Sequence, residues 1–324
     1  EDTQGTFHLK KAENISYLYF PIAGEAGLKS SFTPNLGGDA KIDQNTFLLE
    51  PVSAENLVNN RNSRNFWCNV KGIGSWSLTG NAAEALSKKF TEMQDDSEVT
   101  AGFMWQKTTR ESKKYQLRGE ILSFIPVEKN VEVMLVTITN TGRMAQTVTP
   151  TAAIPLYGRS ADNIRDHRHV TSLLHRIETT DIGVLVTPTL SFDERGHQVN
   201  HMTYYCVGWS GNGEKPVDFY PTAEDFVGEG GNFERPYAIV KNAEGVKAGT
   251  RIEGLEAVGG LHFSEVTLEP EEECSYLIFT GITEDIQEIR NLSKTYTTRE
   301  MVLEELEKTK AYWQEKVNVA YHTG

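Results

Sequence analysis

Short runs of β-branched and aromatic residues dominate the chain from about residue 16 to about residue 280, and they constrain the fold more than any other feature. Each run is bounded by Gly, Pro, Asn or Asp, and examples are SYLYFPI, TFLLEPV, NFWCNV, GFMWQ, YQLRGEILSFIPV, VEVMLVTITN, GVLVTPTL and SYLIFTG. No helical pattern alternates with these runs, which excludes a parallel βαβ design and favours stacked antiparallel sheets. The sequence therefore predicts an all-β domain over residues 1–281, built as a large antiparallel β-sandwich.

The clearest hairpin lies in the segment VEVMLVTITN-TGR-MAQTVTPTAAI. We interpret Val131, Val133 and Leu135 as alternating with polar residues, and Thr141 and Gly142 supply the turn. Alternation of this kind is typical of a strand with one buried face. We therefore expect the opposite face of this hairpin to contact water.

The pattern changes to a helical one over residues 282–324, which we interpret as a helical linker. An apolar stripe recurs at three- and four-residue steps in the second of two helix candidates. We expect that helix to dock along the sandwich through Leu306, Trp313 and Val317. The chain begins at Glu1 without a methionine and ends just after this segment, which suggests a piece of a longer protein.

Composition excludes some classes of protein. The formal net charge of −13 argues against a nucleic-acid partner, because neutralising phosphates requires excess Lys and Arg. No window approaches the roughly 18 uninterrupted apolar residues of a membrane span, so we expect no membrane partner. Cys68, Cys206 and Cys274 are odd in number and far apart, which favours free buried thiols and a cytoplasmic location.

The stretch GRSADNIRDHRH, residues 158–169, concentrates charge and imidazole groups. A phosphate or sugar cradle needs fixed donors, and Arg159, Arg165, His167 and Arg168 are of the required types. The functional hypothesis is that this loop, flanked by Gly158, supplies supporting contacts to a sugar- and phosphate-binding cleft.

Two other interpretations of this stretch remain open. The arginines could pair locally with Asp162 and Asp166, after which the chain would enter a strand, HVTSLLHRIE. His167 and His169 could bind a metal from one face of that strand, although a clear third ligand is lacking.

Tryptophans are the second kind of binding candidate, because their rings can stack on the C–H faces of sugars. Trp67, Trp76, Trp105 and Trp209 all lie in strand patterns where a core position is the commoner outcome. Trp76, in the polar context GIGSWSLTG, is the best candidate for sugar binding.

Several stretches together resemble the N-terminal domain of the inverting β-glucan phosphorylases, the cellobiose phosphorylase family. They are FIPVEKNVEVMLVTITNTG, DFVGEGGNFERPYAIV, LEPEEECSYLIFTGITED and KTKAYWQEKV, in that order. Within that family, YFPIAGEAGLKSSFTPNLGGDAKIDQNTFLLEPVS and YGRSADNIRDHRHVTSLLHRI are most similar to the 1,2-β-oligoglucan (sophoro-oligosaccharide) phosphorylases. The resemblance implies a galactose-mutarotase-like supersandwich, a helical linker and then an (α/α)₆ catalytic barrel, which is missing from this sequence.

The resemblance also implies a role. The parent would cleave β-1,2-gluco-oligosaccharides by direct attack of inorganic phosphate, while one carboxylic acid protonates the leaving oxygen. It implies a β-glucan oligosaccharide substrate, contact with the chain's own barrel, a homodimer, no cofactor beyond phosphate as co-substrate, and no catalytic residue in this domain. Two alternatives stay open: a free-standing carbohydrate-binding module, and an aldose mutarotase-like enzyme that pairs His167 or His169 with Glu178.

Overall fold

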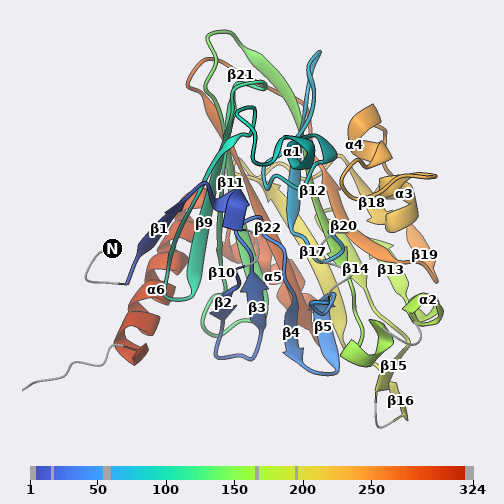
Figure 1. Ribbon diagram of the computed structural model, residues 1–324. Coiled ribbons are helices and arrows are strands. Elements are labelled where there is room, and N and C mark those ends of the chain that lie inside the picture. Colours follow the sequence, from blue (N-terminus) through green and yellow to red (C-terminus); the bar gives the residue numbers. More distant parts are fainter. Residues whose placement is uncertain (1–4, 16–17, 54–59, 165–167, 194–195, 318–324) are drawn as a thin grey trace, which may run out of the picture.

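Two antiparallel β-sheets face each other across a shared core, as Figure 1 shows for the computed structural model of the chain. The structure describes residues 5–15, 18–53, 60–164, 168–193 and 196–317. The predicted all-β fold with a helical C-terminal end is confirmed.

The larger sheet has ten strands in the described residues, and every neighbouring pair is antiparallel. Its order is β1 (Phe7–Lys10), β8 (Asp96–Gly102), β9 (Trp105–Ser112), β10 (Leu117–Phe124), β11 (Val131–Asn140), β22 (Glu273–Thr283), β17 (Thr203–Ser210), β14 (Gly183–Val186), β13 (Arg176–Thr179) and β19 (Arg251–Glu253). The last strand of the chain, β22, thus lies in the middle of this sheet.

Smaller sheets complete the β body. The second layer is β18 (Asp218–Thr222), β20 (Ala257–His262), β12 (Gln146–Leu156), β6 (Asn65–Val70) and β7 (Gly74–Ser77), with β21 (Val266–Leu268) paired to β12. A four-stranded sheet contains β2 (Phe20–Ala23), β3 (Lys29–Phe32), β4 (Ala40–Asp43) and β5 (Thr46–Leu49), and a separate hairpin contains β15 (Leu190–Asp193) and β16 (Gly196–Val199).

Helices lie outside the sheets. They are α1 (Ala83–Lys88), α2 (Arg168–Thr171), α3 (Ala223–Val227), α4 (Tyr237–Lys241), α5 (Ile286–Thr295) and α6 (Arg299–Val317), together with 3₁₀ turns η1 (Ala12–Ile15), η2 (Ala161–Ile164) and η3 (Ser172–Leu174). Within the described residues, no helix combines the length and apolar character needed to cross a membrane.

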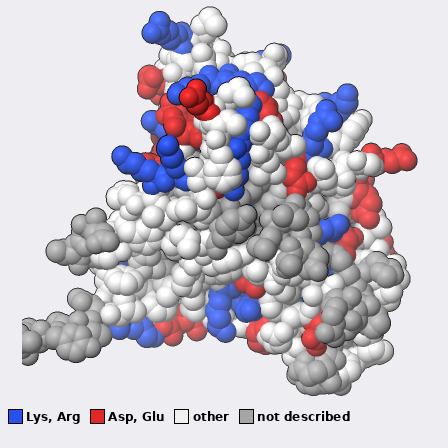
Figure 2. All heavy atoms as spheres, in the orientation of Figure 1, with Lys and Arg blue, Asp and Glu red and all other residues white. Residues whose placement is uncertain are grey.

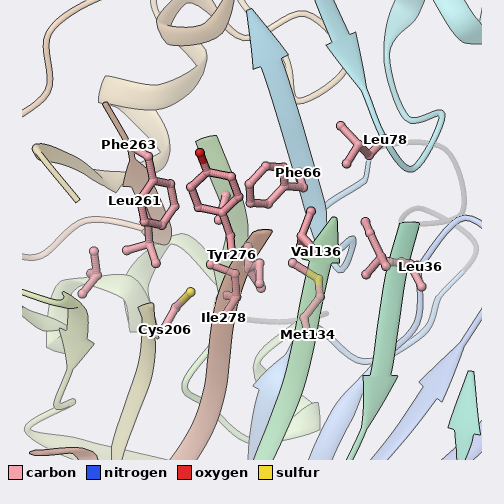
Figure 3. Close-up of a cluster of buried hydrophobic side chains, with 14 of the residues drawn as sticks. Leu36, Phe66, Leu78, Met134, Val136, Cys206, Leu261, Phe263, Tyr276 and Ile278 are labelled. Carbon is pink, nitrogen blue, oxygen red and sulfur yellow. The ribbon is translucent and has the colours of Figure 1, made fainter. Parts of the chain in front are cut away.

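The main core lies between the two large layers. Figure 3 shows Phe66 of β6 opposite Met134 and Val136 of β11, with Tyr276 and Ile278 of β22 beside them. All three cysteines are free thiols; Cys68 and Cys206 are buried in this core and Cys274 is half-buried at its margin.

A second core lies on the outer face of the larger sheet and overturns one expectation. Val131, Val133 and Leu135 face this side, where α5 and α6 cover them, and every residue of β11 is buried. The prediction that one face of this hairpin contacts water is therefore wrong for β11. The reason is that the residues on the opposite, inward face of β11 are not all polar. Met134 and Val136 lie there and pack in the first core, so both faces of the strand are buried.

Helix α6 packs on this outer core through Val302 and Leu306, and Trp313 is also buried. Two of the three predicted docking residues are therefore confirmed. Val317 is 38% exposed, so its predicted docking is wrong. Figure 1 shows the reason: the last turn of α6 lies at the margin of the molecule, beyond the strands.

A buried ion pair connects the layers. Arg64, directly before β6, donates from Nε to Glu132 Oε1 at 2.5 Å and from a terminal nitrogen to Oε2 at 2.9 Å, and both residues are almost fully buried. Arg64 also donates to the Gly38 carbonyl at 2.8 Å, and Ser30 donates to Glu132 at 2.7 Å. The pair therefore holds β6, β11 and the β3–β4 connection together.

Glu132→Gln tests this ion pair. Removing one charge leaves Arg64 buried without its counter-charge, so the free energy of unfolding should fall by about 3–5 kcal/mol. Denaturant titration of the wild type and the variant measures the change. The control is Glu253→Gln, which breaks an exposed pair with Arg176 and should change stability by about 1 kcal/mol or less. Equal effects of the two variants would contradict the role given to the buried pair.

Candidate functional site

The first candidate site is the stretch of residues 158–169 that follows β12, called the charged segment below. Beyond Leu156 the chain continues along β5: Tyr157 and Gly158 donate backbone N–H bonds to Leu48 and Phe47, and Phe47 donates to Arg159. Gly158 has φ of +61°, in the left-handed region that favours glycine. The segment is thus fixed against the β4–β5 hairpin where it leaves the sandwich.

Arg159 lies inside the protein. Its side chain is 5% exposed, and its two terminal nitrogens donate to Glu256 Oε1 and Oε2 at 3.1 and 2.5 Å. Nε donates to the Tyr157 carbonyl at 3.0 Å, and one terminal nitrogen also donates to the Thr171 hydroxyl at 3.2 Å. This is the bidentate geometry in which a guanidinium and a carboxylate interact most strongly. Arg159 therefore clamps the segment to Glu256 and α2, and its donors are already engaged by protein.

Two further polar side chains anchor the same segment. Ser160 and Asn163 both donate to the Phe192 carbonyl on β15, at 2.5 and 2.7 Å. Together with Arg159 they fix the described part of the segment on both sides. Among the described residues Arg159 pairs with Glu256. The open alternative pairs the arginines with Asp162 and Asp166, and Asp166 lies outside the described residues.

The predicted strand HVTSLLHRIE is wrong in its first half. Residues 168–174 form α2 and η3, and a strand begins only at Arg176. Thr171 and His175 are buried whereas Val170 and Leu173 are about half exposed. In a strand Leu173 would lie on the same face as Thr171 and His175, so its exposure fits a helical turn instead. This turn brings Thr171 to Arg159.

His175 is buried close to the ion pair of Arg159 and Glu256, which we call the clamp. Its Nδ1 lies 3.1 Å from the Leu255 carbonyl, which can only accept, so Nδ1 carries a proton. Burial, together with the nearby Arg159 guanidinium, lowers the pKa of His175 to about 4. The imidazole is therefore neutral near pH 7 and acts as a packed donor.

The space beside the clamp is too small for a sugar. A cavity bordered by Tyr157, Phe233 and Glu256 has a volume of about 10 Å³, close to the least that holds one water molecule. The described residues around Arg159 thus form a structural network, and this cavity is too small to hold a sugar.

The other predicted residues of this segment are only partly placed. Arg165 and His167 lie outside the described residues, and Arg168 is the first residue of α2. Within the described ranges, no three His, Cys, Asp or Glu side chains come together in a way that could hold a metal ion. Glu178, the carboxylate of the mutarotase alternative, lies on β13, is half exposed and pairs with Arg251 at 3.5 Å.

Trp76 is a core residue. It is 3% exposed, its Nε1 donates to Asp95 at 2.9 Å, and its ring stacks on Tyr115. The adjoining cavity, bordered also by Glu13 and Glu84, has a volume of about 20 Å³. A sugar contact by Trp76 stays a prediction, and it would first require the ring to be uncovered.

Larger cavities lie where sequence reasoning did not point. A groove of about 620 Å³ crosses the outer face of β8, β9 and β10 and is lined by charged residues such as Glu98 and Arg118. A cavity of about 360 Å³ lies at the end of the sandwich, beside the first residues of β22. The groove is lined by residues 10–11 and by residues 96–120 of three consecutive strands, and the cavity by three segments between residues 210 and 276, so no single short motif marks either of them.

A buried histidine and aspartate pair was also missed. His262 Nδ1 lies 2.6 Å from Asp218 Oδ1, and both side chains are almost fully buried beside the Tyr220 ring. The two residues are 44 positions apart and meet only because β18 pairs with β20. Because both are buried, the pair joins these strands and does not present a base to solvent.

Comparison with protein families gives one match. Residues 51–299 match the family described as "Glycosyl hydrolase 94, supersandwich domain". No curated protein sequence matches the chain.

Solved structures with similar folds include larger carbohydrate-active proteins. A bacterial glucoamylase in complex with acarbose is 10% identical with a TM-score of 0.50, and the match covers 96% of this chain and 40% of that one. A protein from the human microbiome assigned as a kojibiose phosphorylase is 8% identical with a TM-score of 0.45, covering 97% and 38%. A protein from Escherichia coli K12 assigned as an aldose 1-epimerase is 8% identical with a TM-score of 0.42, covering 82% and 99%. At these identities the likeness concerns the fold alone, and the chain spans about 40% of the length of the first two.

The buried histidine behind the clamp makes stability pH-dependent. Because the pKa of His175 falls from 6.5 to about 4 on folding, its contribution is complete above pH 6.5 and is lost as the pH falls through 4. We expect the unfolding free energy to lose about 3 kcal/mol from this group between those pH values. Denaturant titrations at several pH values measure this loss.

The His175→Gln variant should lack this component, since glutamine can donate to Leu255 but does not titrate. The exposed His201→Gln variant is the control and should keep the wild-type pH dependence. If His175→Gln shows the same loss as the wild type, the assignment is wrong.

Proposed function

The chain belongs to the glycosyl hydrolase 94 supersandwich domain family, and from this premise we propose that it is the non-catalytic N-terminal β-sandwich domain of a carbohydrate-active phosphorylase. The family match over residues 51–299 carries the proposal. In the proposed parent a helical catalytic barrel follows α6. The three free thiols fit a parent that works in a reducing compartment such as the cytoplasm.

The charged segment supports a non-catalytic role. A catalytic or phosphate-binding group needs free donors or a titratable group open to substrate. Arg159 instead has donors engaged by Glu256, Tyr157 and Thr171, and His175 is buried. Arg159 and His175 therefore hold the segment in place, and neither of them is open to substrate as an acid or a base.

The packing of the helices supports a rigid connection to a following domain. Val302, Leu306 and Trp313 bury one side of α6, and Trp209 on β17 donates from Nε1 to the Tyr296 carbonyl at 2.9 Å. A helix held in this way gives the next part of the chain a fixed starting direction relative to the sandwich.

In this proposal the parent phosphorolyses β-1,2-gluco-oligosaccharides with inversion. Phosphate oxygen forms a bond to the anomeric carbon as the glycosidic C–O bond breaks, and an acid outside this chain protonates the leaving oxygen, which yields glucose 1-phosphate. Arg165, His167 and Arg168 are the residues proposed to contact phosphate or sugar. Arg159 is reassigned as a positioning residue, because it holds the start of that segment.

The test is an assay of the complete gene product that contains this chain. We expect phosphate-dependent release of glucose 1-phosphate from β-1,2-linked glucotriose, and Arg168→Ala should raise the KM for phosphate about tenfold with a smaller effect on kcat. Arg251→Ala, which removes an exposed partner of Glu178, is the control. If glucose 1-phosphate is released from cellobiose but not from the β-1,2-linked substrate, the proposed β-1,2 linkage specificity is wrong. A reading frame that stops directly after Gly324 would contradict the domain assignment.

We place a homodimer contact on the face shown in Figure 2. Charged side chains gather toward the upper part and the lower rim of this face, and the described atoms in the left part of its middle are mostly uncharged. Two copies that each carry a charge of −13 repel, so an uncharged area is the least costly place for contact. Leu18, shortly before β2, and Val52, shortly after β5, are 49% and 40% exposed, and they are the apolar residues proposed to enter the contact.

Light scattering of the chain in solution tests this contact. The wild type should have the mass of a dimer, and Leu18→Glu/Val52→Glu should shift it toward the monomer, since two carboxylates would enter an apolar interface. Met144→Glu, at an apolar residue that is 73% exposed on another loop, is the control and should leave the mass unchanged. A monomeric wild type, or an equal shift in the control, would contradict the contact.

A further inference from the structure

A cavity of about 360 Å³ opens at the end of the sandwich, within the range typical of small-molecule sites. Three segments far apart in the chain border it. They are the turn after β17 (residues 210–215), the connection from β20 into β21 (residues 263–268) and the start of β22 (residues 272–276).

The turn after β17 is held rigidly. Ser210 donates its backbone N–H to the Glu214 carbonyl at 2.8 Å, and its hydroxyl accepts from the backbone N–H groups of Asn212 and Glu214. Gly211 donates to the Ser275 carbonyl at 2.7 Å, and a Cβ there would lie 2.1 Å from the Ser275 hydroxyl oxygen. The turn therefore sits directly on β22, and its side chains are presented from a preorganised backbone.

The lining of the cavity has an apolar floor and a rim of polar side chains that form no hydrogen bonds with the rest of the described protein. Phe263 and Tyr276, with ring centroids 4.7 Å apart, lie at the floor. Asn212, Glu214 and Ser264 are exposed at the rim, and none of their side chains has a hydrogen bond or ion pair within the described residues. An apolar floor with a few free polar groups fits a ligand that has both C–H surfaces and hydroxyl groups.

The charge of the lining excludes anions. Four carboxylates border the cavity against a single lysine; they are Glu214, Glu265, Glu272 and Glu273, with Lys215. Lys215 is paired with Asp181 at 2.5 Å, and two of the carboxylates are paired as well, Glu265 with Lys71 and Glu273 with Arg299. The carboxylates of Glu214 and Glu272, which form no ion pair within the described residues, therefore set the sign of the local charge. A phosphate or sugar phosphate would meet an unfavourable potential here, whereas neutral hydroxyl groups can donate to the free carboxylate of Glu214.

We propose that this cavity is a carbohydrate-binding site that takes the end of a neutral gluco-oligosaccharide. The cavity and its charge select a neutral polyhydroxyl ligand, and the choice of a glucan rests on the proposed function. Asn212 and Glu214 bind the sugar hydroxyls, and the floor formed by Phe263 and Tyr276 contacts the sugar C–H surface. The site retains the polymer on the sandwich and performs no reaction.

Calorimetric titration of the 324-residue chain with β-1,2-linked glucotriose tests the proposal, with saturation-transfer NMR as a second readout. The wild type should bind the sugar, and Asn212→Ala/Glu214→Gln should weaken binding about tenfold through loss of hydrogen bonds, one of them to a charged group. Glu244→Gln, an exposed carboxylate outside the lining, is the matched control and should bind like the wild type. Ser264→Trp, which places a large ring at the rim, should abolish binding and provides a second variant.

Parallel titrations with glucose 1-phosphate and with spermidine distinguish other ligand classes. The proposal expects no binding of glucose 1-phosphate to this cavity and no competition by spermidine. Absence of sugar binding, equal binding by the double variant, or tighter binding of either charged probe would overturn it. The phosphorolysis assay reads a reaction of the complete gene product, so the proposed function and this site can fail independently.

Discussion

The buried ion pair between Arg64 and Glu132 fixes how the layers of this protein fit together. Two charges removed from water are tolerated only where their remaining hydrogen-bonding groups are satisfied. Here the guanidinium reaches the Gly38 carbonyl and lies over the Phe32 ring, while Ser30 donates to the carboxylate. The β3–β4 connection must therefore approach closely, and a Cβ at Gly38 would lie 2.1 Å from the Ser31 carbonyl oxygen. One interaction thus places the four-stranded sheet against both main layers.

Because the central strands are buried on both faces, ligand-binding sites must lie elsewhere in the protein. β11 is enclosed between the inner core and the helices α5 and α6, so its side chains contact no ligand. Two cavities among the described residues lie at the periphery, on the outer face of β8–β10 and at the end of the sandwich near β22. A scaffold whose middle is closed in this way offers binding surfaces only through its turns and its uncovered sheet face.

The charged segment after β12 shows how burial changes the meaning of a residue. Arg159 has the chemistry of a phosphate ligand, but with Glu256 on both of its terminal nitrogens it is part of the framework. His175 has the imidazole of a general base, but it is buried away from substrate, and its lowered pKa makes it a weak base. The segment is therefore first a structural junction between β12, the β4–β5 hairpin and α2.

The sequence by itself determined the fold class, the presence of a C-terminal helix and the docking of that helix through Leu306 and Trp313, because strand and helix periodicities are local properties of the chain. Only the tertiary structure decided that β11 is buried on both faces, that Trp76 is a core residue, and that Thr171 and His175 belong to a helical turn and its end. It alone brought together Arg64 with Glu132 and His262 with Asp218. Such pairs depend on which strands become neighbours, and the free energy that selects those neighbours comes from packing across the whole sandwich, which no short stretch of sequence contains.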